Sequence, residues 1–138
     1  MTGQPELKLK GVRVLLVEDS FLVAASISRM LEDLGCKVVG PVARVEEALE
    51  IVRETGCDAG ILDVNLGVET SERVATEFLN RQVPFLFVTG YMSPPGTDPK
   101  FTNFRRLHKP LTEVMLADAL LLNMNAVTDR GKPAPTTE

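Results

Sequence analysis

Carboxylates stand directly after two of the apolar runs in this chain. Glu18 and Asp19 follow the run 12–17, and Asp63 follows the run 59–62. Apolar runs of this length suit strands that are covered on both faces, as in a parallel sheet. Acids brought together at strand ends repel one another unless a cation lies between them. Three carboxylates supply the oxygen ligands that a hard divalent cation requires, and the set favours Mg²⁺.

The acid pair alone has a simpler interpretation. Asp19 or Ser20 could cap the following helix, because short polar side chains accept hydrogen bonds from the free amides at a helix start. Asp63 favours the cation site over a plain acidic turn, since it is a third acid at the end of a second strand-like run. Thr89 and Lys109 stand at the ends of two later runs. Taken alone, they fit a turn threonine and a solvated lysine.

The elements that must position these residues alternate along the chain. Apolar periodicity and turn residues predict strands over 12–17, 37–39, 59–62, 84–88 and 105–108. The same signals predict helices over about 21–34, 45–54 and 112–126, and one that begins near Thr70 or Ser71. Strands that alternate with helices form a parallel sheet with helices on both faces. Ligands then bind beyond the carboxyl ends of the strands, where all five candidate residues fall.

Length and composition fit one globular domain over residues 11–126, between flexible termini at 1–10 and 127–138. Of the 138 residues, 44% are apolar and 25% are charged, and the net charge is −4. This mild acidity gives no basic surface for nucleic acid. No apolar run is long enough for a membrane span and the N-terminus lacks a signal-peptide core, which predicts a cytoplasmic protein with no membrane partner. Cys36 and Cys57 are expected to be reduced thiols.

Four elements occur in order, each at the end of a predicted strand: Glu18-Asp19, Asp63, Thr89 and Lys109-Pro110. With them, the chain resembles the receiver domains of two-component response regulators over about residues 11–126. The resemblance implies an α/β, flavodoxin-like, doubly wound parallel sheet of five strands in the order 2-1-3-4-5. It also implies a phosphoacceptor rather than an enzyme, with a sensor histidine kinase or a histidine phosphotransfer protein as partner.

The resemblance assigns a role to each matching residue. Asp63 would accept the phosphoryl group, and Asp19 and Asp63 would hold Mg²⁺. Glu18 would act through a water on the metal, and the backbone carbonyl of Asn65 would be a further ligand. Lys109 would pair with Asp63 and then with the phosphoryl oxygens.

Two further expectations concern the neighbouring strand ends. Thr89 would contact a phosphoryl oxygen through its hydroxyl and draw its loop inward, and the peptide bond before Pro110 would be cis. His108 is expected at the surface without a chemical role, because Leu107 takes the inward position in the alternation of the strand.

The sequence departs from the family at three places. The position of the usual switch aromatic, three residues before Lys109, holds Arg106, and Tyr91 is the candidate to replace it. Residues 87–91 resemble the Phe-Ala-Thr-Gly-x-Tyr signature of a receiver subgroup.

Three prolines and a glycine predict that the fourth helix of the family, over 93–103, is short or irregular. The last helix is more apolar than one buried face requires, which suggests a homodimer or partner surface.

These features predict a stand-alone receiver, with no DNA-binding output domain after residue 126, that acts by protein contact or as a phosphoryl shuttle or sink. A haloacid-dehalogenase-like phosphatase would place its nucleophile after the first strand and an aspartate two residues further on, where this chain has Asn65 after Asp63. A flavin carrier would need a phosphate-binding loop after the first strand. The remaining alternative is a phosphorylation-independent interaction module with the receiver fold, which would have no need of the acid cluster.

Overall fold

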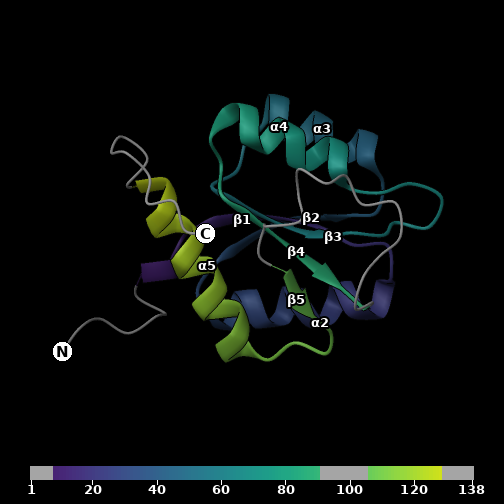
Figure 1. The fold of residues 1–138 in the computed structure, drawn as a ribbon. Helices are drawn as coiled ribbons and strands as arrows, with labels where there is room; N and C mark the ends of the chain where they lie inside the picture. Colours follow the sequence, from purple (N-terminus) through teal and green to yellow (C-terminus); the bar gives the residue numbers. More distant parts are fainter. Residues whose placement is uncertain (1–7, 91–105, 129–138) are drawn as a thin grey trace.

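The computed structural model describes residues 8–90 and 106–128, which contain one parallel sheet of five strands in the order β2-β1-β3-β4-β5. The strands are β1 (Arg13–Val17), β2 (Lys37–Val42), β3 (Ala59–Asp63), β4 (Phe85–Thr89) and β5 (Arg106–His108). The helices are α2 (Phe21–Asp33), α3 (Val45–Glu54), α4 (Glu72–Arg81) and α5 (Glu113–Thr128). Figure 1 shows α3 and α4 on one side of the sheet and α2 and α5 on the other. The predicted flavodoxin-like fold and strand order are confirmed.

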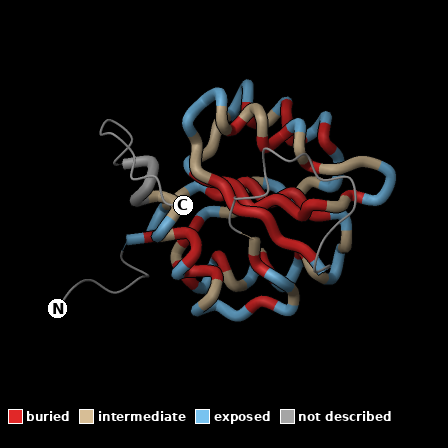
Figure 2. The backbone as a smooth tube through the Cα atoms, in the orientation of Figure 1, coloured by how far each residue is buried: buried red, intermediate tan, exposed pale blue. Residues whose placement is uncertain are grey.

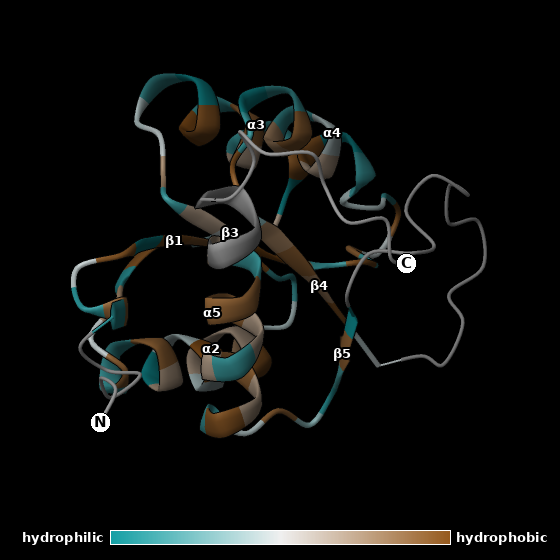
Figure 3. Ribbon diagram, turned by 60° about the vertical axis from the view of Figure 1, so that its left-hand side comes forward, coloured by the Kyte–Doolittle hydropathy of each residue, from teal (hydrophilic) through white to brown (hydrophobic). Residues whose placement is uncertain are grey.

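The central strands are buried on both faces, so each strand contributes to two apolar cores. In β1, Val14 and Leu16 pack in the core under α2 and α5, and Leu15 and Val17 pack in the core under α3 and α4. Figure 2 shows buried backbone running through the centre of the sheet, with exposed residues on the outer sides of the helices. Figure 3 shows the matching hydropathy, with apolar residues facing the strands. This arrangement explains why the strands lack a polar face in the sequence.

Local signals set most of the element boundaries. The hydroxyl of Ser20 accepts a hydrogen bond from Val23 N at 3.3 Å and caps α2, as predicted. Gly35, at φ 91°, follows the end of that helix in the left-handed conformation that glycine adopts at low cost. Helix α3 has the predicted bounds, and Ser71 is the residue before α4. His108 is exposed and Leu107 is buried, in agreement with the predicted alternation.

Two predictions near the edges of the domain are wrong. Strand β2 does not stop before Gly40-Pro41 but continues to Val42, since β2 is an edge strand where a missing proline N–H can face away from the ladder. Leu9 lies within the stretch expected to be a loose lead-in, yet it is 0% exposed and belongs to the core under α2 and α5. One apolar residue between two lysines carries no periodicity, so its burial leaves no pattern in the sequence.

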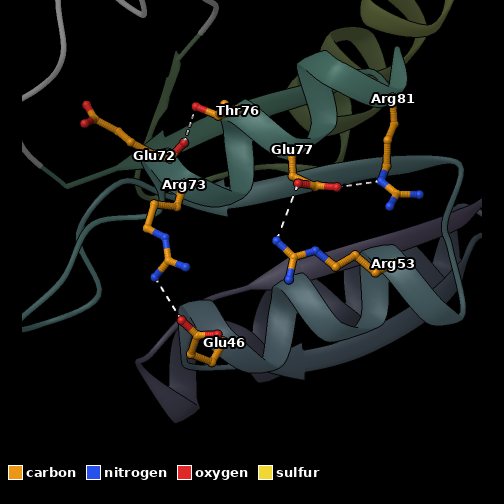
Figure 4. A network of polar contacts seen from close by, with 7 residues as sticks. All are labelled: Glu46, Arg53, Glu72, Arg73, Thr76, Glu77 and Arg81. Carbon is orange, nitrogen blue, oxygen red and sulfur yellow. Dashed lines mark hydrogen bonds and ion pairs between the residues drawn. The ribbon is translucent and has the colours of Figure 1, made fainter.

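Ion pairs join the outer surfaces of α3 and α4 (Figure 4). Arg73 of α4 contacts Glu46 of α3 at 2.9 Å. Glu77 of α4 accepts from Arg81 at 2.7 Å on its own helix and lies 3.7 Å from Arg53 on α3. Exposed pairs of this kind contribute little to stability, so the shared core beneath them holds the two helices together.

Some predictions lie outside the described residues. They are the short or irregular helix over 93–103 and the role of Tyr91. Within the described residues both cysteines are free thiols, and burial raises the pKa of Cys36 and of Cys57 to about 11. No helix in residues 8–90 and 106–128 has the length and apolar character needed to span a membrane.

Gly60 lets α4 approach the middle of the sheet. It is the second residue of β3, and a Cβ built on it would lie 2.5 Å from the ring of Phe78 on α4. Phe78 is fully buried and stacks on Phe85 of β4, with ring centroids 5.7 Å apart. The ring therefore occupies the space that any side chain at residue 60 would need.

Gly60→Ala is expected to lower the free energy of unfolding by about 1–3 kcal/mol, because an added methyl group would push the Phe78 ring out of a filled core. Urea denaturation measures the change. Gly90→Ala is the matched control, since no atom of the described residues lies within 4 Å of a Cβ built there and its φ lies outside the left-handed range. Equal stability of the two variants would contradict this account of the packing.

Candidate functional site

The three predicted acids meet at the carboxyl ends of β1 and β3. Glu18 and Asp19 directly follow β1, and Asp63 is the last residue of β3. Each offers a carboxylate oxygen, and these oxygens all lie within 4.8 Å of one another. They border a cavity of about 580 Å³. Its lining is made by Glu18, Asp19, Ser20, Asp63, Asn65, Gly67, Gly90 and Lys109.

Lys109 brings a positive charge to the acids from the end of β5. Its Nζ lies 3.2 Å from Asp63 Oδ2, to which it donates a hydrogen bond, and 3.0 Å from Glu18 Oε1. The contact with Glu18 is an ion pair without hydrogen-bond geometry, so Oε1 has no hydrogen-bond partner among the described residues. The Lys109–Pro110 bond is cis, as the family resemblance predicts.

Burial sets the electrostatics of the site. Glu18 is 3% exposed, and loss of hydration raises the pKa of its carboxyl group, with further upward shifts from the neighbouring Asp63. The N–H of Ser20 donates to Glu18 Oε2 at 3.0 Å and opposes this rise. Burial alone would lower the pKa of Lys109, but its contact with Glu18 and the charge of Asp63 outweigh that effect and raise it. Both interactions favour a charged ammonium at neutral pH.

Asp63 is held by groups on both sides. The backbone N–H of Asn65 donates to Oδ1 at 3.3 Å, while Lys109 contacts Oδ2. Gly67 follows in the same loop with φ 85°, and a Cβ built there would lie 3.7 Å from Asp19 Oδ2. Asn65 and Gly67 of the loop after β3 therefore bring their backbone close to the acids.

Thr89 ends β4 beside the cavity-lining Gly90 and is 1% exposed. Its backbone carbonyl accepts from Lys109 N at 3.0 Å, so the strand ends that carry the threonine and the lysine are tied together. Arg106 lies elsewhere, with its guanidinium carbon 5.6 Å from the centre of the Phe87 ring. The position that the family gives to an aromatic residue thus makes a cation–π contact with β4.

The residues around the cavity fit a magnesium ion. The donor set is three carboxylates, and the buried Glu18 Oε1 has the ion pair with Lys109 but no hydrogen-bond partner among the described residues. The backbone of Asn65 is already close, since its N–H contacts Asp63. Oxygen ligands with more than one carboxylate are what Mg²⁺ binds, and the set contains no thiol or imidazole that would favour a softer metal.

Sequence reasoning missed Ser20, Gly67 and Gly90 as parts of this site. Ser20 was assigned only to the helix cap, yet its N–H also positions Glu18. The two glycines line the cavity through their backbones. Such residues leave no side-chain signal, although a glycine shortly after an acid-ended strand is consistent with close approach of the backbone.

An apolar groove of about 380 Å³ adjoins the acidic cavity. Helix α2 and the segment after β5 form its walls, which consist of Leu22, Val23, Ser26, Ile27, Met30, Lys109, Pro110 and Leu111. Lys109 lines both hollows. At the start of α2, Phe21 and Leu22 are 84% and 78% exposed.

A five-stranded parallel sheet in the order 2-1-3-4-5, with three acids and a lysine at its carboxyl edge, defines the class of receiver domains. The family model of the response regulator receiver domain matches residues 14–120, and the chain belongs to this family. Membership makes the chain a receiver domain of two-component signalling.

Three matches, two of them to solution structures of SdrG, show what the chain resembles within the family. It is 34% identical over 82 residues to the response regulator UvrY of Escherichia coli K12, a match that covers 56% of this chain and 38% of UvrY. The solution structure of SdrG from Sphingomonas melonis Fr1 is 41% identical, with a TM-score of 0.71, and the match covers 80% of this chain and 94% of SdrG. A solution structure of the BeF3-activated conformation of SdrG from Pseudomonas melonis Fr1 is 42% identical, with a TM-score of 0.66, covering 79% of this chain and 92% of that one.

Added Mg²⁺ is expected to raise the melting temperature of the protein, and Asp19→Asn is expected to remove most of that rise. Asp19 is exposed, so the substitution itself should cost little stability. Differential scanning fluorimetry with and without Mg²⁺ measures the effect, and Asp33→Asn at the exposed end of α2 is the matched control. Equal Mg²⁺-induced shifts in both variants would argue against Asp19 as a ligand.

Proposed function

We propose that the chain is a phosphoryl-accepting receiver of a two-component phosphorelay, phosphorylated on Asp63 with the help of Mg²⁺. The contact of Asp63 with Lys109, next to Glu18 and Asp19 at the carboxyl edge of the sheet, carries this proposal. A carboxylate in a cavity open to solvent, with a fixed ammonium at one oxygen, can attack a phosphodonor as a nucleophile.

In the transfer step, a lone pair of one Asp63 oxygen forms a bond to the donor's phosphorus. The bond from phosphorus to the donor's imidazole nitrogen breaks, and that nitrogen keeps the electron pair and takes up a proton from solvent. Lys109 orients the acceptor and then offsets charge on the phosphoryl oxygens, because its Nζ is already 3.2 Å from Asp63 Oδ2. The N–H of Asn65 restrains the other oxygen of the acceptor.

Asp19, Asp63 and the carbonyl of Asn65 would hold the magnesium ion, with Glu18 acting through water. When bound, the ion offsets the negative charge that the acceptor, the acid cluster and the phosphoryl group bring together. Without such an ion, Glu18 and Asp63 share the ammonium of Lys109, and no ion pair is found for Asp19 among the described residues. This imbalance is the electrostatic reason for expecting a metal.

Thr89 and Lys109 would bind the phosphoryl oxygens and so couple phosphorylation to a change in the loops. It replaces a carboxylate by a group with a charge of about −1.5 to −2 and three acceptor oxygens. Shifting a two-state loop from 1:99 to 99:1 takes about 5.5 kcal/mol. Hydrogen bonds to charged groups contribute roughly 1.5–3 kcal/mol each, so the threonine hydroxyl and the ammonium together would supply much of this difference.

The sequence around β4 supports the finer assignment to the Phe-Ala-Thr-Gly-x-Tyr subgroup. Phe87, Thr89 and Gly90 match the signature, while Val88 replaces its alanine and Tyr91 stands one position earlier than its tyrosine. We assign the chain an output through protein contact, or a role as a phosphoryl shuttle or sink. The match covers only 38% of UvrY, so no activity of the rest of UvrY is proposed for this chain.

The phosphodonor is a histidine kinase or a histidine phosphotransfer protein. Such a donor must bring a phosphorylated imidazole to Asp63, so its surface has to cover the rim of the cavity. The apolar groove beside α2 shares Lys109 with that cavity, and the exposed Leu22 lies on its wall. An exposed apolar patch continuous with the reaction site is the surface where a protein donor gains binding energy.

Asp63→Asn is expected to abolish labelling by acetyl phosphate in the presence of Mg²⁺, because an amide oxygen is not a competent nucleophile here. Intact-protein mass spectrometry detects the added phosphoryl group. Asp58→Asn, at the amino end of β3, is the control and should label normally. Unchanged labelling of the Asp63 variant would refute Asp63 as the acceptor, and a wild-type protein that takes no label would favour a phosphorylation-independent interaction module.

Leu22→Arg is expected to slow phosphotransfer from the cognate histidine donor about tenfold or more, through loss of an apolar anchor, and to leave labelling by acetyl phosphate unchanged. Leu122→Arg on α5 is the control, since Leu122 is also an exposed leucine but does not line the groove. The two reactions are compared by rate. If both donors slow equally, the substitution has damaged the site itself and the docking assignment is wrong.

A further inference from the structure

Helix α3 begins without a side-chain cap from its own N-cap residue. Arg44 occupies that position and makes no side-chain hydrogen bond to the helix. The amide of Val45, the first residue of α3, instead donates to Glu69 Oε2 at 3.1 Å. Glu69 stands 24 residues further along, in the loop between Asp63 and α4. A carboxylate at this place satisfies a free N–H and opposes the positive end of the helix dipole.

The loop that carries Glu69 is a closed turn attached to Asp63. Leu66 N donates to Glu69 O at 2.8 Å, and Ser71 N donates to Val64 O at 3.1 Å. Val64 and Leu66 are buried in the core under α3 and α4, so alternate residues of the loop are anchored. Asn65, between them, points its N–H at Asp63 Oδ1. The position of Glu69 is therefore transmitted through a short, hydrogen-bonded turn to the backbone that contacts the phosphoacceptor.

The segment before α3 also contacts the other acid-bearing loop. The carbonyl of Val42 accepts from Glu18 N at 2.9 Å. Residues 42–45 thus hold the loop after β1 through Val42 and the loop after β3 through Val45. Both loops that bring acids to the cavity are therefore hydrogen-bonded to the same segment, residues 42–45.

We infer that Glu69 is a positioning residue of the acidic site. Its hydrogen bond to Val45 N holds the turn after Asp63 so that the backbone of Asn65 stays against Asp63, beside the acids that would hold the metal. Glu69 acts through the shape of the loop, not through its own charge on the cation. The inference rests on the proposed function, because it concerns the same magnesium site.

Three variants distinguish the effect of the loop conformation from the effect of the Glu69 charge and from a general loss of stability. Glu69→Ala removes the acceptor, whereas Glu69→Gln keeps an oxygen for Val45 N and removes the charge. Asp58→Ala is the matched control, because Asp58 also accepts from a backbone amide, Arg13 N at 2.9 Å, but lies at the opposite ends of β1 and β3. Circular dichroism verifies folding, and titration calorimetry gives the Mg²⁺ dissociation constant. Hydrogen exchange of the Leu66 and Ser71 amides is followed in metal-free protein.

Glu69→Ala is expected to weaken Mg²⁺ binding about tenfold and to speed exchange of both amides, as for groups that orient metal ligands indirectly. Glu69→Gln should stay within about threefold of wild type, and Asp58→Ala within about twofold. The inference is overturned if Glu69→Ala binds Mg²⁺ as tightly as the control, or if Glu69→Gln is as weak as Glu69→Ala. Wild-type protein that binds no Mg²⁺ would overturn the proposed function. Unchanged exchange of the Leu66 and Ser71 amides in Glu69→Ala would instead contradict the role given to the Glu69–Val45 hydrogen bond, whether or not Mg²⁺ binds.

Discussion

One ammonium held between two buried carboxylates is the interaction on which the rest of this structure depends. Lys109 contacts Glu18 at 3.0 Å and Asp63 at 3.2 Å, and each of the three comes from the end of a different strand. Removing such charges from water costs several kcal/mol per ion, so the arrangement persists only if the strands hold their ends in register. The order that places β3 between β1 and β4 keeps the acid-bearing ends adjacent, and the tie between Lys109 N and Thr89 O brings in the end of β5.

The side-chain members of the site were accessible from the sequence, because each one ends an apolar run. Parallel strands place their carboxyl ends at one edge, so Glu18, Asp19, Asp63 and Lys109 could be predicted to meet once the strands were recognised. The strand order needed the resemblance to receivers, since apolar runs contain no information about which strands are neighbours. The chemical roles of these residues remain predictions, as does the metal.

The features that sequence reasoning missed depend on contacts between distant segments. Glu69 and Val45 are joined by a hydrogen bond across 24 residues, with no periodicity to connect them. Leu9 is a single apolar residue whose burial follows from its neighbours in space. Strand β2 passes through Gly40-Pro41 because it lies at the edge of the sheet, and that location is a property of the whole fold. Local patterns therefore predicted elements, and tertiary packing decided their limits.

Lys109 lines both the acidic cavity and the apolar groove beside α2. A substitution that altered the groove at this residue would also remove the charge next to Asp63, so under the docking proposed for the histidine donor the chemistry and the choice of partner are inseparable there. Descendants of this protein that acquire a new signalling partner must therefore vary other residues of the groove. Leu22, Ser26 and Met30 on α2 are free of that constraint, and divergence between paralogous pathways should concentrate on this helix.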